Sequence, residues 1–167
     1  MIFGDKSRFA ISIDLDNDSG GQWLFGRFCY WISGAVVGDY DSGTSLRDVL
    51  FQMKYIAGDR GGRFCPALLE LSADHALHVI SDAINEGSGD FYNYVKNDFL
   101  PARLDVRIPV DIFDSWRIFL IDGCGGSRLL YGMIYSSGAN ALDLRYGEFD
   151  TIFGEAYSYL NMIYDKC

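Results

Sequence analysis

Residues 8–40 restrict the fold more than any other part of the chain, because three successive runs in it have the patterns of β-strands. The run RFAISIDL alternates apolar and polar side chains, with Phe9 and Ile11 on one face and Ser12 on the other, as a half-buried strand requires. The run QWLFGRFCYWI carries bulky residues on both faces and predicts an interior strand, and GAVVGDY predicts a strand that pairs with it. These runs predict a three-stranded meander. Most aromatic side chains of the middle run are expected in the core: Trp23, Phe25, Phe28, Tyr30 and Trp31.

The hydrophobic period changes to that of a helix at Ser45. The sequence SLRD matches a capping box, and apolar residues then recur at helical spacing over residues 46–57. Ser72 caps a second predicted helix, whose left-handed C-terminal cap is expected at Gly87. The run DFYNYVKNDFLP, residues 90–101, predicts a third and shorter helix.

The last third of the chain returns to strands before a closing helix. The run SWRIFLIDGCGGSRLLYGMIYSS predicts a β-hairpin, residues 141–150 predict one more strand or a turn, and residues 151–164 predict a helix. Strands and helices follow one another without regular βαβ alternation. The sequence therefore predicts an α+β fold, with a mainly antiparallel sheet of about five or six strands packed with three or four helices. Residues 1–167 are expected to form a single domain.

The charge balance narrows the range of partners. The 167 residues include 23 acidic and 14 basic side chains, which gives a formal charge of −9. Such a surface repels the phosphates of nucleic acids and attracts basic proteins, whose association rate it raises. We therefore expect no nucleic-acid partner and a cationic protein partner.

The cysteines and the apolar runs indicate a cytoplasmic protein. The four cysteines contain no CxxC pair, which favours reduced thiols over a disulfide framework or a zinc site. The N-terminal run MIFGDKSRFAISIDLDND lacks the pattern of a secretory signal. No stretch reaches the length of about 18 uncharged apolar residues that a membrane span needs, so no membrane partner is expected.

Two groups of residues are candidates for chemistry. His75, His78 and Asp82 recur at i, i+3 and i+7 of the second predicted helix, where their side chains would converge as a metal site or an acid–base pair. An amphipathic helix also places such residues at its solvent edge, and no HExxH motif supports the metal site. The glycines of GCGGS, residues 123–127, precede a strand, which favours a hairpin turn over a phosphate loop. The sequence thus predicts no catalytic residue, metal or cofactor, and a small metal-assisted hydrolase using the three helical residues is the enzymatic alternative.

A first acidic turn follows the first predicted strand. Asp14, Asp16 and Asp18 have the spacing of the first ligands of a calcium loop. The sixth and twelfth positions of that loop would be Ser19 and Phe25, where an EF-hand needs glycine and glutamate. An acidic hairpin turn is therefore favoured over a calcium site.

A second acidic turn has an aromatic residue at its centre. Tyr40 lies between Asp39 and Asp41, and tyrosine is enriched among the residues that dominate protein interfaces. We predict that the two acidic turns form a partner-binding surface. Its candidate contact residues are Asp14, Asp16, Asp18, Asp39, Tyr40 and Asp41.

Several segments resemble the immunity proteins of bacterial polymorphic toxin systems, specifically immunity protein family forty-two. The segments are GDKSRFAISIDLD, GGQWLFGRFCYWISGAVVGDYDSGTSLRDVL, RIPVDIFDSWRIFLIDG, RLLYGMIYSS and GEFDTIFGEAYSYLN. The likeness runs nearly from end to end, and its most specific part is residues 23–50.

The resemblance implies a small cytosolic protein, encoded beside a secreted effector such as a contact-dependent growth inhibition toxin, that binds and blocks the C-terminal domain of that toxin. It implies no enzymatic activity and no cofactor. Because toxic nucleases hold their substrates in cationic clefts, the acidic composition leads us to expect a basic nuclease whose active surface is occluded. A non-toxin adaptor protein is the remaining alternative, and nothing in the sequence specifies an oligomeric state.

Overall fold

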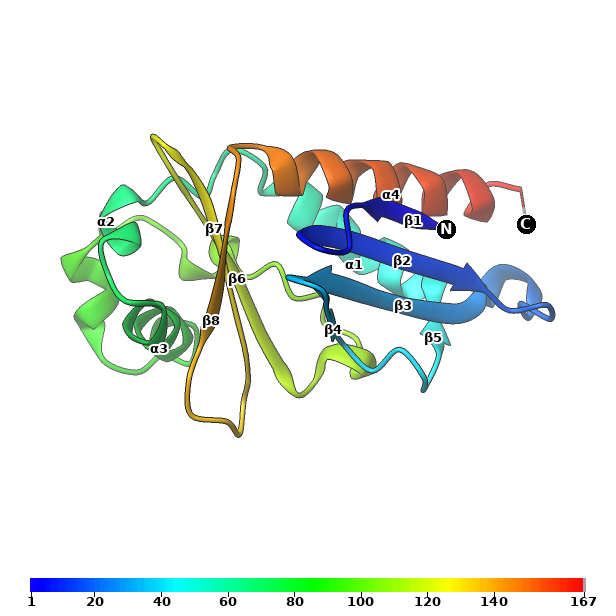
Figure 1. Cartoon of the computed structure of the whole chain (residues 1–167), viewed down its shortest axis with the longest axis horizontal. Helices are drawn as coiled ribbons and strands as arrows, with labels where there is room; N and C mark the ends of the chain where they lie inside the picture. The colour runs from blue at the N-terminus through cyan, green and yellow to red at the C-terminus, as the bar shows by residue number, and fades with distance from the viewer. Residues whose placement is uncertain (167) are drawn as a thin grey trace. The chain divides into compact units, whose positions relative to one another are not determined.

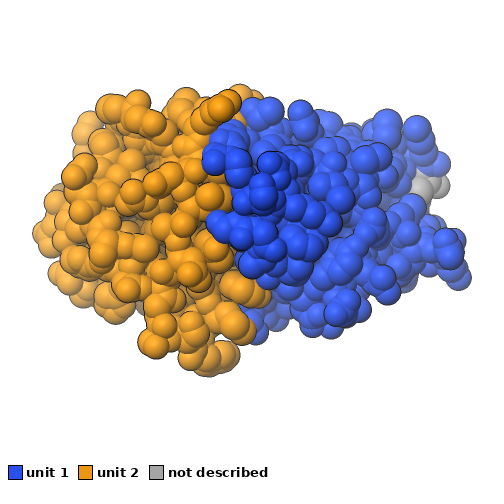
Figure 2. Space-filling view, in the orientation of Figure 1, with its two compact units in different colours: residues 1–58, 108–115, 148–167 blue, residues 59–107, 116–147 orange. Residues whose placement is uncertain are grey.

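The structure, a computed structural model, describes residues 1–166 and divides into two compact units (Figure 2). Unit 1 comprises residues 1–58, 108–115 and 148–167, and unit 2 comprises residues 59–107 and 116–147. The described residues form four α-helices and two antiparallel sheets, of five and three strands. The predicted α+β class with antiparallel pairing is confirmed, with the strands divided between two sheets. The expectation of a single domain stays a prediction.

Unit 1 is built on the five-stranded sheet (Figure 1). Its strands are β1 (Ile2–Gly4), β2 (Phe9–Leu15), β3 (Phe25–Ile32), β4 (Ala35–Val37) and β5 (Thr44–Ser45). They lie in the order β1-β2-β3-β4, and β5 also pairs with β3. The predicted meander is present, and β3 is an interior strand as its two-sided apolar pattern indicates.

Two helices, α1 (Leu46–Gly58) and α4 (Glu148–Tyr164), cover one face of this sheet. In Figure 1, α4 runs along β1 and β2, and the ring of Phe9 in β2 stacks on Phe149 of α4 at a centroid distance of 5.0 Å. Because side chains alternate along a strand, the residues of opposite parity in β2 and β3 project from the other face.

The start of α1 agrees with the predicted capping box. The hydroxyl of Ser45 accepts a hydrogen bond from the amide of Asp48 at 3.2 Å, which satisfies one of the amides that a helix start leaves unpaired. Helix α4 begins at Glu148, three residues before the predicted start at residue 151.

A short 3₁₀ turn, η4 (Asp111–Phe113), completes the core of unit 1. The side chain of Phe113 is fully buried, and its ring lies 5.0 Å from that of Tyr30 in β3. The amide of Asp39, in the loop between β4 and β5, donates to the carbonyl of Ile112 at 2.8 Å. Phe113 therefore anchors both η4 and the loop that carries the second acidic turn.

Unit 2 packs helices on the three-stranded sheet, whose order is β6-β7-β8. Its elements are α2 (Pro66–Leu69), α3 (Ala73–Ile84), the 3₁₀ turns η2 (Gly89–Asn93) and η3 (Pro101–Leu104), and β6 (Trp116–Gly123), β7 (Gly126–Met133) and β8 (Asn140–Leu144). Strands β6 and β7 pair in register up to Gly123 and Gly126, which confirms the predicted glycine hairpin. Ser72 caps α3 as predicted, accepting from the amide of His75 at 3.2 Å.

The prediction of a third helix over residues 90–101 was wrong. Only η2 forms at its start, and Pro101 opens η3. In this segment Phe91 is buried in the core of unit 2, and Tyr94, Val95 and Phe99 pack against that core partly buried, from a chain that is not helical.

The prediction of a left-handed cap at Gly87 was also wrong. The residue with positive φ after α3 is Glu86, at 56°. The amide of Gly87 donates to the carbonyl of Asp82 at 2.9 Å, and a Cβ on Gly87 would lie 2.1 Å from the Asp82 carboxylate. A glycine stands here because the Asp82 side chain occupies the space of a Cβ.

Candidate functional site

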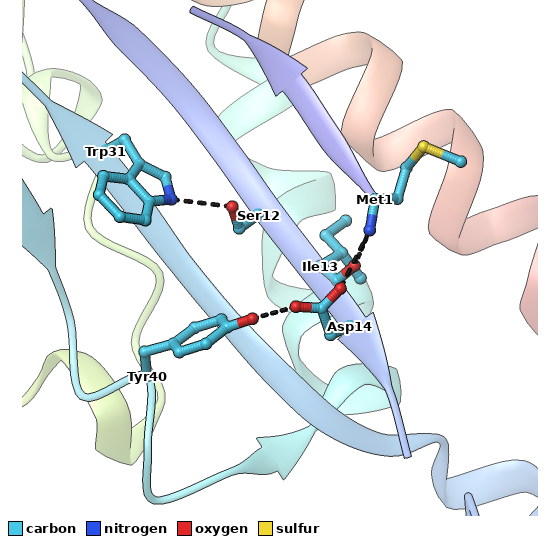
Figure 3. Close-up of polar contacts among 6 residues, drawn as sticks. All are labelled: Met1, Ser12, Ile13, Asp14, Trp31 and Tyr40. Carbon is cyan, nitrogen blue, oxygen red and sulfur yellow. Dashed lines mark hydrogen bonds and ion pairs between the residues drawn. The ribbon is translucent and has the colours of Figure 1, made fainter. Parts of the chain in front are cut away.

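A hydrogen bond joins the two predicted acidic turns (Figure 3). The hydroxyl of Tyr40, in the loop between β4 and β5, donates to the carboxylate of Asp14 near the end of β2. The Asp14 carboxylate also pairs with the amino group of Met1 at 3.1 Å. The structure therefore brings together two of the predicted contact residues that lie 26 positions apart in the sequence.

This hydrogen bond changes the titration of both partners. The hydroxyl of Tyr40, followed by the amino group of Met1, lowers the pKa of Asp14 below its usual value. The same bond raises the pKa of Tyr40 to about 12. Asp14 is therefore ionised and Tyr40 protonated at neutral pH, and the amino group of Met1 offsets the charge of the Asp14 carboxylate.

Hydrogen bonds within the second turn also stabilise the ionised carboxylate of Asp39. The hydroxyl and the amide of Ser42 both donate to the Asp39 carboxylate, and the hydroxyl is the larger cause of its lowered pKa. Asp41 is exposed beside it. Asp18, in the first turn, accepts from the amide of Gly20 at 3.3 Å. These bonds fix the conformation of each turn and leave carboxylates at the surface.

Asp16 faces an acidic groove at the edge of the sheet where β5 pairs with β3. The groove has a volume of about 700 Å³. Three carboxylates line it, from Asp16, Asp48 in α1 and Asp111 in η4. Asp111 accepts hydrogen bonds from the hydroxyl of Thr44 at 3.3 Å and from the amide of Ile112 at 2.9 Å. The rest of the lining is uncharged: Phe25, Gly26, Ser42, Gly43, Thr44, Ser45, Gln52, Pro109 and Val110.

An exposed aromatic pair borders this groove. The rings of Trp23 and Phe25 stack at a centroid distance of 6.4 Å and an angle of 4°, and these residues are 49% and 45% exposed. The guanidinium of Arg47 lies 3.7 Å above the Trp23 ring and pairs with Asp48 at 2.9 Å. Arg47 therefore partly neutralises one of the three groove carboxylates.

The prediction that Trp23 and Phe25 belong to the core was wrong, whereas Phe28 and Tyr30 are buried and Trp31 is half-buried. The chain between β2 and β3 turns through left-handed residues that include Leu24, with φ of 51°. The strand therefore starts at Phe25, and Trp23 lies in the 3₁₀ turn η1 (Gly21–Trp23).

The sheet face opposite the helices carries the polar side chains of β2 and β3. Asp14 lies opposite Arg27 in the register of these strands. The indole nitrogen of Trp31 donates to the hydroxyl of Ser12 at 2.8 Å, as Figure 3 shows, and the ammonium of Lys6 lies 4.0 Å from the centre of the Trp31 ring. Rings and hydrogen-bonded polar groups thus cover this face.

Most of the negative charge belongs to unit 1. Unit 1 has thirteen acidic and six basic residues, a formal charge of −7, and unit 2 has ten acidic and eight basic residues, a formal charge of −2. All six predicted contact residues lie in unit 1. Sequence reasoning did not assign Asp48 and Asp111 to the site, because their approach to Asp16 depends on tertiary contacts.

The residues of the enzymatic alternative do not converge. The rings of His75 and Tyr94 meet edge to face at 6.2 Å, both histidines are exposed, and the Asp82 carboxylate accepts from the hydroxyl of Ser88 at 2.6 Å. Within residues 1–166, no group of three or more His, Cys, Asp or Glu side chains is arranged to hold a metal ion. The geometry therefore gives the metal-assisted hydrolase no support.

Across residues 1–166, no helix combines the length and the apolar character that crossing a membrane requires.

Comparison with known proteins gives one family and one fold. The family model described as Immunity protein 42 matches residues 1–159. The chain is also similar to the crystal structure of CdiI from Burkholderia dolosa AUO158, with a TM-score of 0.73 and 19% sequence identity over 95% of this chain and 99% of that chain. At this identity the likeness is one of fold. No curated protein matches the sequence at a significant level.

Proposed function

Because the chain belongs to the immunity protein 42 family, we propose that it protects a bacterium against one toxin of a contact-dependent growth inhibition system. It is an immunity protein, and its partner is a cognate toxin protein. It binds the C-terminal domain of that toxin in the cytoplasm, without turnover of its own. The family match over residues 1–159 is the observation that carries this proposal.

The charge distribution favours a basic toxin, and we propose a nuclease. A nuclease gathers its polyanionic substrate with a cationic cleft. Unit 1, with a formal charge of −7, offers that cleft a competing anionic surface. Occlusion of the cleft in a one-to-one complex would then stop the reaction.

The acidic groove of unit 1 supports this proposal. Asp16 and Asp111 line it together with the exposed residue Phe25, and the Asp111 carboxylate accepts from the hydroxyl of Thr44. Lysine and arginine side chains bind such surfaces through charge-assisted hydrogen bonds and through contact with aromatic rings. The guanidinium of Arg47 already lies over Trp23 in this way.

Electrostatic steering and the buried interface area would have separate effects on binding. Complementary charge raises the association rate toward about 10⁸ M⁻¹s⁻¹ at low salt. Affinity requires a buried interface of about 1,600 Å². Rapid association matters to a cell that must neutralise an arriving toxin.

Co-expression with the toxin domain encoded by the neighbouring gene tests the function. We expect the cells to survive and the two proteins to elute as one complex from a sizing column. Unimpaired killing together with separate elution would reject the proposal. Purified protein that is free of metal and gains no stability from added zinc or manganese would remove the remaining enzymatic alternative.

Charge reversal tests the contact residues separately. The variants Asp16→Lys and Asp111→Lys, and the pair Asp39→Lys with Asp41→Lys, should slow association with the toxin about 10-fold at low salt. The difference should vanish near 1 M salt, where the Debye length is about 3 Å. Asp98→Lys is the matched control for the two single variants, because it makes the same charge change at an exposed site in unit 2. Equal rates for the groove variants and this control would reject the contact assignment and leave the function intact.

A further inference from the structure

Unit 2 exposes three consecutive apolar residues at the end of β7 and in the loop that leads to β8. Met133, Ile134 and Tyr135 are 43%, 44% and 92% exposed. This loop lies at the lower end of the strands in Figure 1. Single exposed apolar residues are ordinary in proteins, but an exposed run of three usually has a function.

Hydrogen bonds hold this loop at both ends. The guanidinium of Arg117 in β6 and the amide of Ser136 both donate to the carbonyl of Met133, each at 3.2 Å. At the other end, the amide of Ala139 donates to the carboxylate of Asp74. The apolar side chains are therefore presented on an ordered loop, which lowers the entropic cost of binding.

A cavity of about 330 Å³ lies beside the loop, lined by Ile134 together with Trp116, Arg117, Phe119 and residues of α3. Two buried polar atoms of its lining have no hydrogen-bond partner among residues 1–166, namely Nε of Arg117 and Oγ of Ser81. Buried polar groups in native proteins almost always have a partner. The Ser81 hydroxyl can donate or accept, but Nε of Arg117 can only donate, so the partner missing from Arg117 is an acceptor.

The charges around the cavity favour a negatively charged acceptor. Arg107 and Arg117 bring two guanidinium groups to the lining, against one carboxylate from Asp105. Burial raises the pKa of that carboxylate above its usual value. The lining thus carries a positive charge on a chain that is acidic as a whole.

Resting on the proposed function, we infer that Arg117 and residues 133–135, here called the loop surface, form a second contact with the toxin. The partner segment brings an apolar side chain against Ile134 and Tyr135, and an aspartate or glutamate carboxylate to Arg117. Tyr, Trp, Met and Arg are the residues enriched at protein interfaces, and all four types occur at this cavity or its loop. This contact sets the dissociation rate, because its apolar part does not depend on long-range charge.

Biolayer interferometry of the whole chain against the neighbouring toxin domain tests this inference. Tyr135→Ala is expected to raise the dissociation rate at least about 10-fold, the factor that corresponds to 1.4 kcal/mol, with an unchanged association rate. Ile134→Asp and Arg117→Gln are expected to act in the same direction. Tyr55→Ala, which removes a 69% exposed tyrosine from unit 1, is the matched control.

Three outcomes would overturn the inference. Dissociation within about twofold of wild type for both Tyr135→Ala and Ile134→Asp, with normal toxin binding by wild type, would reject the loop surface alone. Self-association of the wild-type chain that Ile134→Asp abolishes would assign the surface to a second copy. Failure of wild type to bind any toxin domain would reject the proposed function together with this contact. Because Tyr135 is almost fully exposed, its replacement leaves the fold intact.

Discussion

Replacing Phe113 by alanine tests whether the packing beneath η4 supports the acidic groove. The side chain is fully buried, and its ring lies 5.0 Å from Tyr30 and 6.1 Å from Phe28. Truncation of a buried phenylalanine removes its transfer free energy and leaves a cavity, at a cost of about 3–5 kcal/mol. The Phe113 ring packs closely against Gly38, since a Cβ added to Gly38 would lie 3.0 Å from the ring. Neighbouring side chains therefore have little room to move into the cavity. We therefore expect the full cost in the free energy of unfolding.

Urea unfolding at 25 °C measures this change. The free energy of unfolding should fall by about 3–5 kcal/mol with an unchanged dependence on urea concentration. Tyr55→Ala should change it by less than about 0.5 kcal/mol, since that side chain is largely exposed. Hydrogen exchange at the Asp39 amide supplies a local measurement, because that amide donates to the carbonyl of Ile112 in η4. A loss below about 1 kcal/mol, or unaltered exchange at Asp39, would refute the view that Phe113 anchors both segments.

Two further predictions follow from the pKa shifts. Tyr40→Phe should raise the pKa of Asp14 toward its usual value, measurable from carboxyl carbon chemical shifts; an unchanged pKa would contradict the hydrogen bond. The folded pKa of Asp14 is below its unfolded value, so the hydrogen bond contributes stability above about pH 3.9. This stability is lost as the pH falls through the folded pKa. Because the carboxylate is half exposed, the contribution is below about 1 kcal/mol. Burial raises the pKa of Cys29 to about 11 and that of Cys65 to about 12, so both thiols should react with iodoacetamide at pH 8 far more slowly than exposed Cys124. Equal labelling of the three by peptide mass mapping would count against this.

The parts of the fold that the sequence predicts correctly are those with a local periodic pattern. Strand β2, the hairpin of β6 and β7, and the caps at Ser45 and Ser72 depend on residues close to one another in the chain. The errors at Trp23 and Phe25 have a different origin. Aromatic residues at strand spacing usually face a core, but three left-handed residues between β2 and β3, including Leu24, delay the start of the strand. Such backbone angles leave little trace in a hydrophobic pattern.

The candidate site likewise has parts that the sequence predicts and parts that depend on long-range contacts. The two acidic turns could be found from composition, because each groups its carboxylates within a few residues. The link between them is a long-range hydrogen bond from Tyr40 to Asp14, and the groove adds Asp111, whose partner Thr44 is 67 positions away. Only the register of β5 on β3 and the burial of Phe113 bring these groups together.

The two proposed contacts differ in the physical effect on which each depends, and this has a kinetic consequence. Unit 1 carries −7 of the formal charge of −9, and long-range attraction of this kind acts on the encounter of two proteins and weakens with salt. The loop surface in unit 2 combines exposed apolar side chains with the half-buried side chain of Arg117, whose Nε atom is buried, and short-range contacts of this kind act after the encounter. An inhibitor that used only the first would capture the toxin quickly and release it in salt, whereas one that used only the second would bind too slowly to protect the cell. A chain that must do both gains from combining long-range charge with short-range apolar contact in one inhibitor.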